Sequence, residues 1–253
     1  MEKSLFKHVH FDEIDSTSAY LIRERNNYEN FTFVSTDYQT RGKGREIRKW
    51  ISSKGANLLF SFLLKDKELM HEFGSISLAC AATIANYLIS KGFKGIQIKW
   101  PNDVYMDGKK ICGILLEGYI NEYIVVGIGL NINQEEFPDD LHHPATSLYL
   151  ETNKRYEIET FRDELFECLY NDINSKNIQE KHYLNVINAL DFLKGKDIVV
   201  EINGKLEKVK ALGINENNSL SVLFNGEKYF IISGEINFDY EQAGRRIPDQ
   251  SGK

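Results

Sequence analysis

The sequence predicts an α+β protein, in which a large domain of helices and strands precedes a small all-β module. Two segments, 74–90 and 160–173, have the apolar spacing of helices and stand among short apolar runs typical of strands. After Gly195 the helical spacing ends, and four short apolar runs alternate with Asn-Gly and Asn-Asn pairs, which favour tight turns. We therefore divide the chain into a large domain, a β-module and a polar tail, at residues 1–193, 194–240 and 241–253.

A short helix, two strands and a loop open the large domain. Residues 16–18 are Ser-Thr-Ser, and hydroxyl side chains cap helix N-termini, so we expect a helix over about 17–25. Residues 31–35 and 58–64 are apolar runs of strand length. Between them, residues 41–50 contain two glycines and five basic side chains. Their apolar residues follow neither the helical nor the strand period, which predicts a loop.

Two long helices and three further strands complete this domain. The first helix is rich in alanine, so we expect it to pack closely on a sheet. Thr160 opens the second helix in our prediction, with Asp163 as its capping-box partner. Its apolar face carries Phe161, Leu165, Leu169 and Ile173. The strands are predicted at 95–99, 110–118 and 123–130, with a hairpin at 119–122, and those of the β-module at 198–202, 206–212, 220–224 and 229–232.

Composition and charge exclude several classes of protein. Hydrophobic residues are 42% and charged residues 27% of the 253 residues, which argues against wholesale disorder. The net charge is −6, which argues against a protein that coats nucleic acid. The three cysteines are widely spaced, so we expect no disulfide framework and no cysteine zinc site. No apolar run follows Met1 or approaches the length of a membrane span, so we expect a cytoplasmic protein without a signal peptide.

The basic loop at 41–50 is the first candidate for chemistry. Glycines allow close backbone approach and cations neutralise charge, which suits a phosphate-binding loop. Trp50 closes the loop and could cover a purine or an apolar ligand. A solvated basic loop and a nucleic-acid patch remain alternatives at this point.

Two further motifs lie at predicted strand ends. Residues 99–103, Lys-Trp-Pro-Asn-Asp, end a strand, and Lys110 leads the next apolar run. A lysine at the head of a buried strand is costly to desolvate unless an anion meets it. A capped turn and an exposed lysine are the simpler alternatives. Residues 127–133, Gly-Ile-Gly-Leu-Asn-Ile-Asn, lack the third glycine and the helix of a dinucleotide fingerprint, but their alternation puts Asn131 and Asn133 on one side.

Taken together and in this order, the motifs resemble those of the biotin–protein ligases. The resemblance is strong over about residues 10–150 and continues to Ser233-Gly234-Glu235. It implies a mixed sheet packed on helices, followed by an SH3-like barrel, and the form of the family without an N-terminal DNA-binding domain. The motifs that carry it are Asp15-Ser16-Thr17-Ser18, residues 42–50, residues 99–103, Lys110 with Gly113-Ile114-Leu115-Leu116-Glu117, residues 127–133, and Ala145-Thr146-Ser147-Leu148.

The resemblance implies a two-step reaction. ATP activates the carboxylate of biotin as biotinyl-5′-AMP, and a lysine on the biotin carboxyl carrier domain of a biotin-dependent carboxylase then attacks it. Lys110, Arg45 and Asp103 are the implied catalytic residues, and Asp103 would orient or deprotonate the incoming amine. The implied biotin-binding residues are Ser16, Thr17, Ser18, Gln39, Gly42, Lys43, Gly44, Arg45 and Lys110. The implied adenylate-binding residues are Arg45, Arg48, Trp50, Asn102, Asn131 and Asn133.

The remaining expectations concern partners and departures from the family pattern. Mg²⁺ is expected with ATP, but the sequence predicts no carboxylate cage for it, and a homodimer is a family-level expectation. Lys43 replaces an arginine of the usual loop, and Ile47 replaces a glycine, which stiffens the loop. The alternatives are a lipoate–protein ligase, and a non-catalytic module that binds biotinyl-adenylate or a nucleotide.

Overall fold

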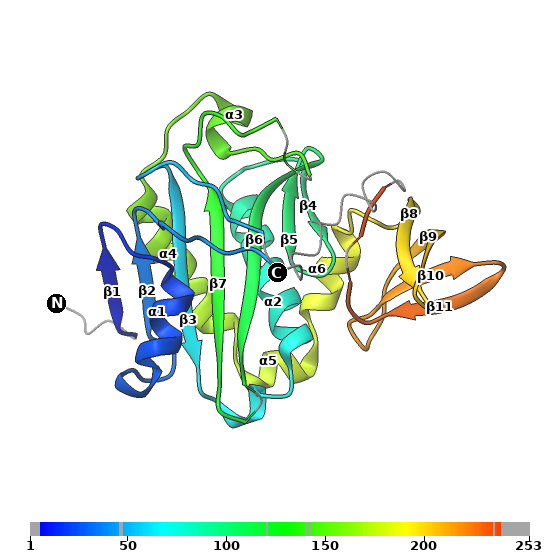
Figure 1. The fold of residues 1–253 in the computed structure, drawn as a ribbon, viewed down its shortest axis with the longest axis horizontal. Helices are drawn as coiled ribbons and strands as arrows, with labels where there is room; N and C mark the ends of the chain where they lie inside the picture. The colour runs from blue at the N-terminus through cyan, green and yellow to red at the C-terminus, as the bar shows by residue number, and fades with distance from the viewer. Residues whose placement is uncertain are drawn as a thin grey trace, which may run out of the picture. The chain divides into compact units, whose positions relative to one another are not determined.

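The computed structural model describes residues 6–45, 48–119, 121–139, 141, 143–234 and 236–238, with the backbone alone at Ser175. Contacts divide the chain into two compact units, Met1–Leu190 and Asp191–Lys253 (Figure 1). The sequence analysis placed its boundary nearby, after residue 193. Each unit has its own sheet.

The first unit contains a seven-stranded mixed sheet with the order β1-β2-β3-β7-β6-β5-β4. β1 pairs with β2 in parallel, and the other neighbours are antiparallel. The sheet bears out the mixed architecture implied by the resemblance. Its strands are β1 (His8–Phe11), β2 (Phe33–Thr36), β3 (Asn57–Leu64), β4 (Ile96–Lys99), β5 (Asp103–Met106), β6 (Lys109–Tyr119) and β7 (Tyr123–Asn131).

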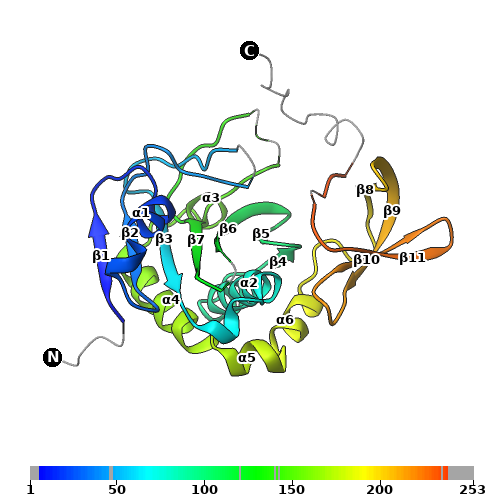
Figure 2. The same cartoon turned by 60° about the horizontal axis from the view of Figure 1, so that its bottom comes forward.

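Helices cover both faces of this sheet (Figures 1 and 2). On one face, Leu21 of α1 (Thr17–Glu24) packs among Val34, Leu63 and Val125, all fully buried. On the other face, Phe166 of α4 (Ile158–Asp172) stacks on Phe33 with ring centroids 3.9 Å apart. The glycines described in the next subsection share the face of α1. The other helical segments are η1 (Arg25–Asn27), η2 (Lys67–Leu69), α2 (Phe73–Ser90), α3 (Leu148–Thr152), α5 (Ser175–Glu180) and α6 (Tyr183–Ala189).

α2 corrects one expectation about apolar length. By length and composition it could cross a membrane, so the prediction that no stretch approaches such a span is wrong for Phe73–Ser90. In the fold, 72% of this helix is buried. Small residues such as Ala81 and Ala85 are fully buried, which lets the helix lie close to its neighbours. Its apolar character is that of a core helix.

The start of α4 corrects a second expectation. The helix begins at Ile158, with Glu157 at the N-cap and no side-chain cap bond, so Thr160 does not open it. Asp163 pairs with Arg162 at 2.8 Å and is not a capping partner. The predicted apolar face is confirmed, because its four members are buried: Phe161, Leu165, Leu169 and Ile173.

The second unit contains a four-stranded antiparallel sheet with the order β11-β10-β9-β8. The strands are β8 (Asp197–Ile202), β9 (Lys205–Ile214), β10 (Leu220–Phe224) and β11 (Glu227–Ile231). Asn203-Gly204 and Asn225-Gly226 form two of the turns with positive φ at all four residues. This is the geometry that Asn-Gly pairs favour in two-residue hairpins, so the predicted turns are confirmed.

Candidate active site

On the α1 face of the sheet, neighbouring glycines leave a surface without side chains, which we call the glycine floor. Gly127 and Gly129 share this face because side chains alternate along β7, and Gly113 of β6 lies directly opposite Gly129. A Cβ atom at Gly129 would lie 2.4 Å from Cε2 of Trp50, and one at Gly113 would lie 2.8 Å from its Cζ3. The indole therefore rests on both glycines, and only glycine permits this approach. The loop that carries Trp50 runs from β2 to β3, across β7 (Figure 1).

Hydroxyl and amide groups occupy one end of this floor. The Thr17 hydroxyl lies 2.7 Å from that of Ser61, and the Ser18 hydroxyl lies 2.9 Å from it. Oε1 of Gln39 accepts hydrogen bonds from the backbone N–H and the hydroxyl of Thr17, at 2.9 and 3.2 Å. Ser16 is the N-cap of α1, as predicted, and accepts from the N–H of Ala19. The structure thus brings the predicted residues 16–18 and Gln39 together in a buried polar network.

A lysine and a carboxylate lie beside the glycines on the other side of the floor. Asp103 is paired with Gly113 across β5 and β6, and its Oδ1 lies 2.7 Å from Nζ of Lys110. The two side chains are 12% and 26% exposed, so the ion pair is largely removed from water. Lys110 Nζ also lies 5.8 Å from the centroid of the Trp50 ring. The anion that a desolvated lysine requires is therefore supplied within the protein by Asp103.

The basic loop folds back on itself over the site. The N–H of Gly44 donates to the carbonyl of Arg48 at 2.8 Å, and the N–H of Trp50 donates to the carbonyl of Gly42 at 3.0 Å. Arg45 donates to Oδ1 of Asn102 at 3.4 Å, which places these two predicted residues together. Lys43 forms an ion pair with Glu117 at 3.2 Å. Ile47 lies outside the described residues.

A pocket with a volume of about 130 Å³ opens next to Trp50 and Lys110. Among the described residues, its lining contains three cations and no carboxylate, which suits a ligand with several negative charges. Asn131 donates from Nδ2 to the carbonyl of Thr146 at 3.0 Å, while its buried Oδ1 has no hydrogen-bond partner among the described residues. A buried acceptor without a partner favours a ligand that carries a donor. The lining residues are Arg48, Lys49, Trp50, Ile51, Lys110, Asn131, Phe137, Leu141, His143 and Ala145.

The sequence analysis missed several of these residues, including His143. It named no histidine as a candidate residue. In the structure, Nε2 of His143 lies 3.1 Å from Nζ of the buried Lys99. A lysine ammonium group can only donate, so a charged Lys99 would use Nε2 of His143 as its acceptor. Lys99 stands in the Lys-Trp-Pro-Asn-Asp motif, which was the only sequence signal that connects His143 to the site.

Asn133 is placed differently from Asn131. It does not line the pocket, and both polar atoms of its amide bond to the backbone of Tyr156. Nδ2 donates to the Tyr156 carbonyl at 2.8 Å, and Oδ1 accepts from the Tyr156 N–H at 3.0 Å. These bonds attach the segment before α4 to the end of β7.

Comparisons with known proteins agree with this geometry. Residues 11–133 match the Biotin/lipoate A/B protein ligase family. The bifunctional ligase/repressor BirA of Bacillus spizizenii is 33% identical over 150 residues, which are 56% of this chain and 46% of that protein. The biotin–[acetyl-CoA-carboxylase] ligase of Mycobacterium tuberculosis is 33% identical over 116 residues, 44% of this chain and 42% of that protein. The chain thus matches less than half the length of these two relatives.

A solved structure extends the similarity over most of the fold. The biotin protein ligase from Aquifex aeolicus, in complex with biotin and ATP, has a TM-score of 0.75 and 29% identity, and the match covers 91% of this chain and 97% of that one. The matched family segment contains residues 16–18, the basic loop, Lys110 and the glycine floor. The protein therefore carries, at residues 11–133, a domain of the biotin/lipoate A/B protein ligase family.

Proposed function

We propose that this protein is a biotin–protein ligase. It uses ATP to convert biotin into biotinyl-5′-AMP, and then transfers biotin to a lysine of the biotin carboxyl carrier domain of a biotin-dependent carboxylase. The observation that carries the proposal is the glycine floor, which has a polar network at one side and the Lys110–Asp103 pair with a cationic pocket at the other. Such a site fits a ligand with a polar head, an apolar chain and a carboxylate that reacts with a bound nucleotide.

The polar network supports the assignment of the biotin head group. A ureido ring offers both donors and acceptors, and Thr17, Ser18 and Gln39 present hydroxyl and amide groups that can match them. The apolar chain of biotin then lies on Gly129 and Gly113, with Gly42, Lys43 and Gly44 of the basic loop above it. A ligand on this floor displaces the indole of Trp50, which already borders the pocket.

The cations support the assignment of the reacting centre. Lys110 offsets the charge of the biotin carboxylate and the α-phosphate of ATP, and Arg45 and Arg48 meet the phosphates from the loop. Preorganised charges of this kind stabilise the transition state because they need no reorganisation as charge develops. Trp50 and Asn131 hold the adenine, with the unpartnered Oδ1 of Asn131 as acceptor for an adenine N–H. Asn102 holds Arg45.

Asp103 acts in the second step in this proposal. Its carboxylate pairs with Lys110 at 2.7 Å and lies opposite Gly113, next to the position proposed for the activated carboxyl group. A carboxylate there can orient the incoming lysine amine and accept its proton. Mg²⁺ would enter with ATP and neutralise part of its phosphate charge, and the described lining of the pocket contains no carboxylate that would hold it.

The wider assignments are part of the same proposal. Residues 1–193 form the catalytic domain, 194–240 an SH3-like module and 241–253 a polar tail. The protein acts in the cytoplasm, as a possible homodimer in keeping with the family resemblance. The acidic net charge of −6 favours a protein partner over DNA.

Biotin-dependent pyrophosphate release and transfer test this function directly. Purified protein is incubated with ATP, Mg²⁺ and biotin, with and without a biotin carboxyl carrier domain. We expect pyrophosphate release that requires biotin, and a carrier that gains the mass of one biotinyl group. Lipoate with its own carrier domain is the matched control. Transfer of lipoate but not biotin would make the protein a lipoate ligase, and ligand binding without pyrophosphate release would make it a non-catalytic module.

A further inference from the structure

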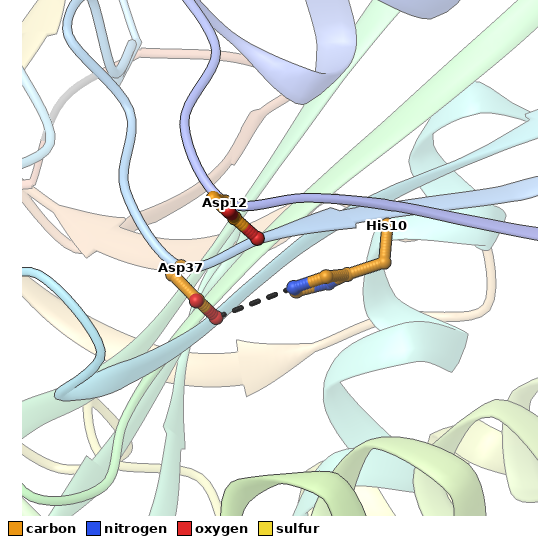
Figure 3. Close-up of side chains that lie close together, drawn as sticks. All are labelled: His10, Asp12 and Asp37. Carbon is orange, nitrogen blue, oxygen red and sulfur yellow. Dashed lines mark ion pairs between the residues drawn. The ribbon is translucent and has the colours of Figure 1, made fainter.

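Three potential metal ligands gather at the ends of β1 and β2, outside the pocket described above. They are His10, Asp12 and Asp37, and one ligand atom from each lies within 4.8 Å of the others (Figure 3). His10 and Asp12 are exposed and Asp37 is half-buried, so an ion could reach them from solvent. Among the described residues, no cation forms an ion pair with Asp12. The cluster contains two carboxylates and one imidazole.

The fold brings these residues together through the parallel pairing of the two strands. His10 lies opposite Ser35, and Phe11 lies opposite Thr36. Side chains alternate along a strand, so His10 and the residue two positions later, Asp12, share one face. Asp37 stands two positions after Ser35 and reaches the same face, and its N–H donates to the Phe11 carbonyl at 3.1 Å. The three ligands thus come from two adjacent backbones held together by hydrogen bonds.

The imidazole of His10 is oriented by a buried serine. Nδ1 of His10 lies 2.9 Å from the Ser35 hydroxyl, which also lies 2.8 Å from Nε2 of His8. The hydroxyl can accept from Nδ1–H of His10 and donate to Nε2 of His8, and in that tautomer Nε2 of His10 carries the lone pair that a metal needs. Histidines that bind metals commonly donate their other ring N–H to such a polar group. Nε2 is the nitrogen that faces Asp37 (Figure 3).

The separation of Nε2 of His10 and Oδ1 of Asp37 is close to that of two ligands bound to one ion. Nε2 of His10 lies 3.4 Å from Oδ1 of Asp37. A good N–H···O bond is shorter, at about 2.9 Å. Two ligands bound to one ion at about 2.05 Å with tetrahedral angles are about 3.3 Å apart. One imidazole and two carboxylates suit zinc and neighbouring first-row divalent metals, whereas Mg²⁺ prefers oxygen ligands alone.

We propose that His10, Asp12 and Asp37 bind one first-row divalent transition-metal ion, such as Zn²⁺, with water completing its coordination. The ion joins the segment 11–15, which leads to Ser16, to the segment 37–41, which carries Gln39. Backbone bonds already align these segments, since the N–H of Thr40 donates to the carbonyl of Ile14 at 2.9 Å. The bound metal therefore stabilises the two chain segments that build the polar end of the glycine floor. The site does not depend on the proposed ligase activity.

Metal binding to tag-free protein, first stripped with a chelator, tests the proposal. Zn²⁺ is titrated against a chromophoric competitor, and Co²⁺ binding is followed by its visible absorption. We expect one strong equivalent in the wild type and a Co²⁺ spectrum that indicates nitrogen and oxygen ligands. His10→Gln and Asp37→Asn should each weaken binding by more than tenfold, and Ser35→Ala by about tenfold because it releases the imidazole. The thermal midpoint should rise with Zn²⁺ in the wild type and not in His10→Gln.

His182→Gln is the matched control. His182 is an exposed histidine whose Nε2 lies 3.2 Å from a carboxylate oxygen of Glu180, in a two-residue pair outside the cluster. Its variant should bind Zn²⁺ like the wild type. Circular dichroism of every metal-free variant separates loss of a ligand from loss of the fold. Binding that is unchanged in folded His10→Gln and Asp37→Asn, or a wild type that binds no Zn²⁺, would overturn the proposal, even if ligase activity is found.

Discussion

Lys110 lies beside the glycine floor, and its environment explains why its loss should have a specific effect on the proposed reaction. An ion pair with Asp103 holds the Lys110 side chain. A Cβ atom added at Gly113 would lie 3.1 Å from Nζ of Lys110. Lys109, its neighbour in the sequence, forms a separate ion pair with Glu151 at 2.9 Å. The chain therefore contains adjacent lysines with different surroundings.

Lys110→Ala should reduce biotin-dependent pyrophosphate release strongly and leave the fold intact. Loss of one preorganised charge costs about 3 kcal/mol of transition-state stabilisation, or about 100-fold in rate. Lys109→Ala is the control and should retain near-normal release. Single-turnover release at saturating ATP and biotin measures both variants. A near-normal rate for Lys110→Ala would remove Lys110 from the first step.

Gly129 and Trp50 should be energetically coupled. A Cβ at Gly129 would approach the indole to 2.4 Å, so Gly129→Ala must displace the ring in the ligand-free protein. We expect Gly129→Ala to lower the free energy of unfolding by about 1–3 kcal/mol in the wild type. In a Trp50→Ala background the same change should cost clearly less, because the clash is gone. Urea unfolding of the four proteins measures the coupling, and an equal cost in both backgrounds would contradict the contact.

Asn131 and Asn133 should respond differently to alanine substitution. Asn133→Ala removes two bonds to the Tyr156 backbone, so we expect a loss of about 1–3 kcal/mol in the free energy of unfolding and little change in the KM for ATP. Asn131→Ala removes the acceptor next to the pocket and should raise the KM for ATP. Urea unfolding and initial rates measure the two effects. A raised KM in stable Asn133→Ala would restore the adenylate-binding role predicted for Asn133.

The basic loop is the element on which retention of an intermediate should depend. It closes on itself through Gly44 and Arg48, and Arg45 connects it to Asn102 at the start of β5. Biotinyl-5′-AMP is a reactive mixed anhydride, so a loop that covers it must exclude both water and foreign amines. In the proposed function, the glycines of the loop permit closure and its cations bind the phosphate.

Arg45→Gly should release the intermediate to solution. The free anhydride acylates accessible amines, so the variant should biotinylate bystander proteins such as albumin far more than the wild type does. Lys54→Gly, at an exposed lysine 4.0 Å from Glu13, is the control and should behave like the wild type. Streptavidin blots of albumin included in the reaction measure the effect. An Arg45→Gly variant that forms no adenylate would instead place Arg45 in the first step.

Some elements were predictable from local patterns and others were not. Ser16 caps α1, and the Asn-Gly turns of the β-module occur where predicted, because these signals act over a few residues. β1 and β5 have only four residues each, too few for a periodic pattern to identify them, and their pairing with β2 and β6 makes them strands. The start of α4 at Ile158 likewise depends on packing, since no side chain caps it.

At the scale of the whole molecule, the burial of the cysteines shows which parts of the first unit are protected from solvent. Cys80 of α2 and Cys112 of β6 are fully buried, and burial raises the pKa of both thiols. Cys168 of α4 is partly exposed, and burial together with nearby carboxylates such as that of Asp172 also raises its pKa. A thiol with a raised pKa contains less reactive thiolate at neutral pH.

Alkylation should therefore follow the fold. At pH 7.5 we expect iodoacetamide to modify Cys168 slowly in the native protein, and Cys80 and Cys112 only after unfolding. Peptide mass spectrometry along a urea titration measures each site, and the latter two should become reactive together with loss of the circular dichroism signal. Rapid native labelling of Cys112 would show that the sheet beside Lys110 opens independently of global unfolding.

The sequence by itself determined the fold class, the β-module and the set of motifs, because helix caps, apolar periods and Asn-Gly turns depend on neighbouring residues. Only the tertiary structure decided how the motifs meet. The pairing of Gly113 with Gly129, the indole on top of them and the ion pair of Lys110 with Asp103 join residues of four separate segments. The same holds for His143 in the pocket and for His10 beside Asp37. Strand register and loop closure over such separations are set by the packing of the whole sheet, which no local pattern contains.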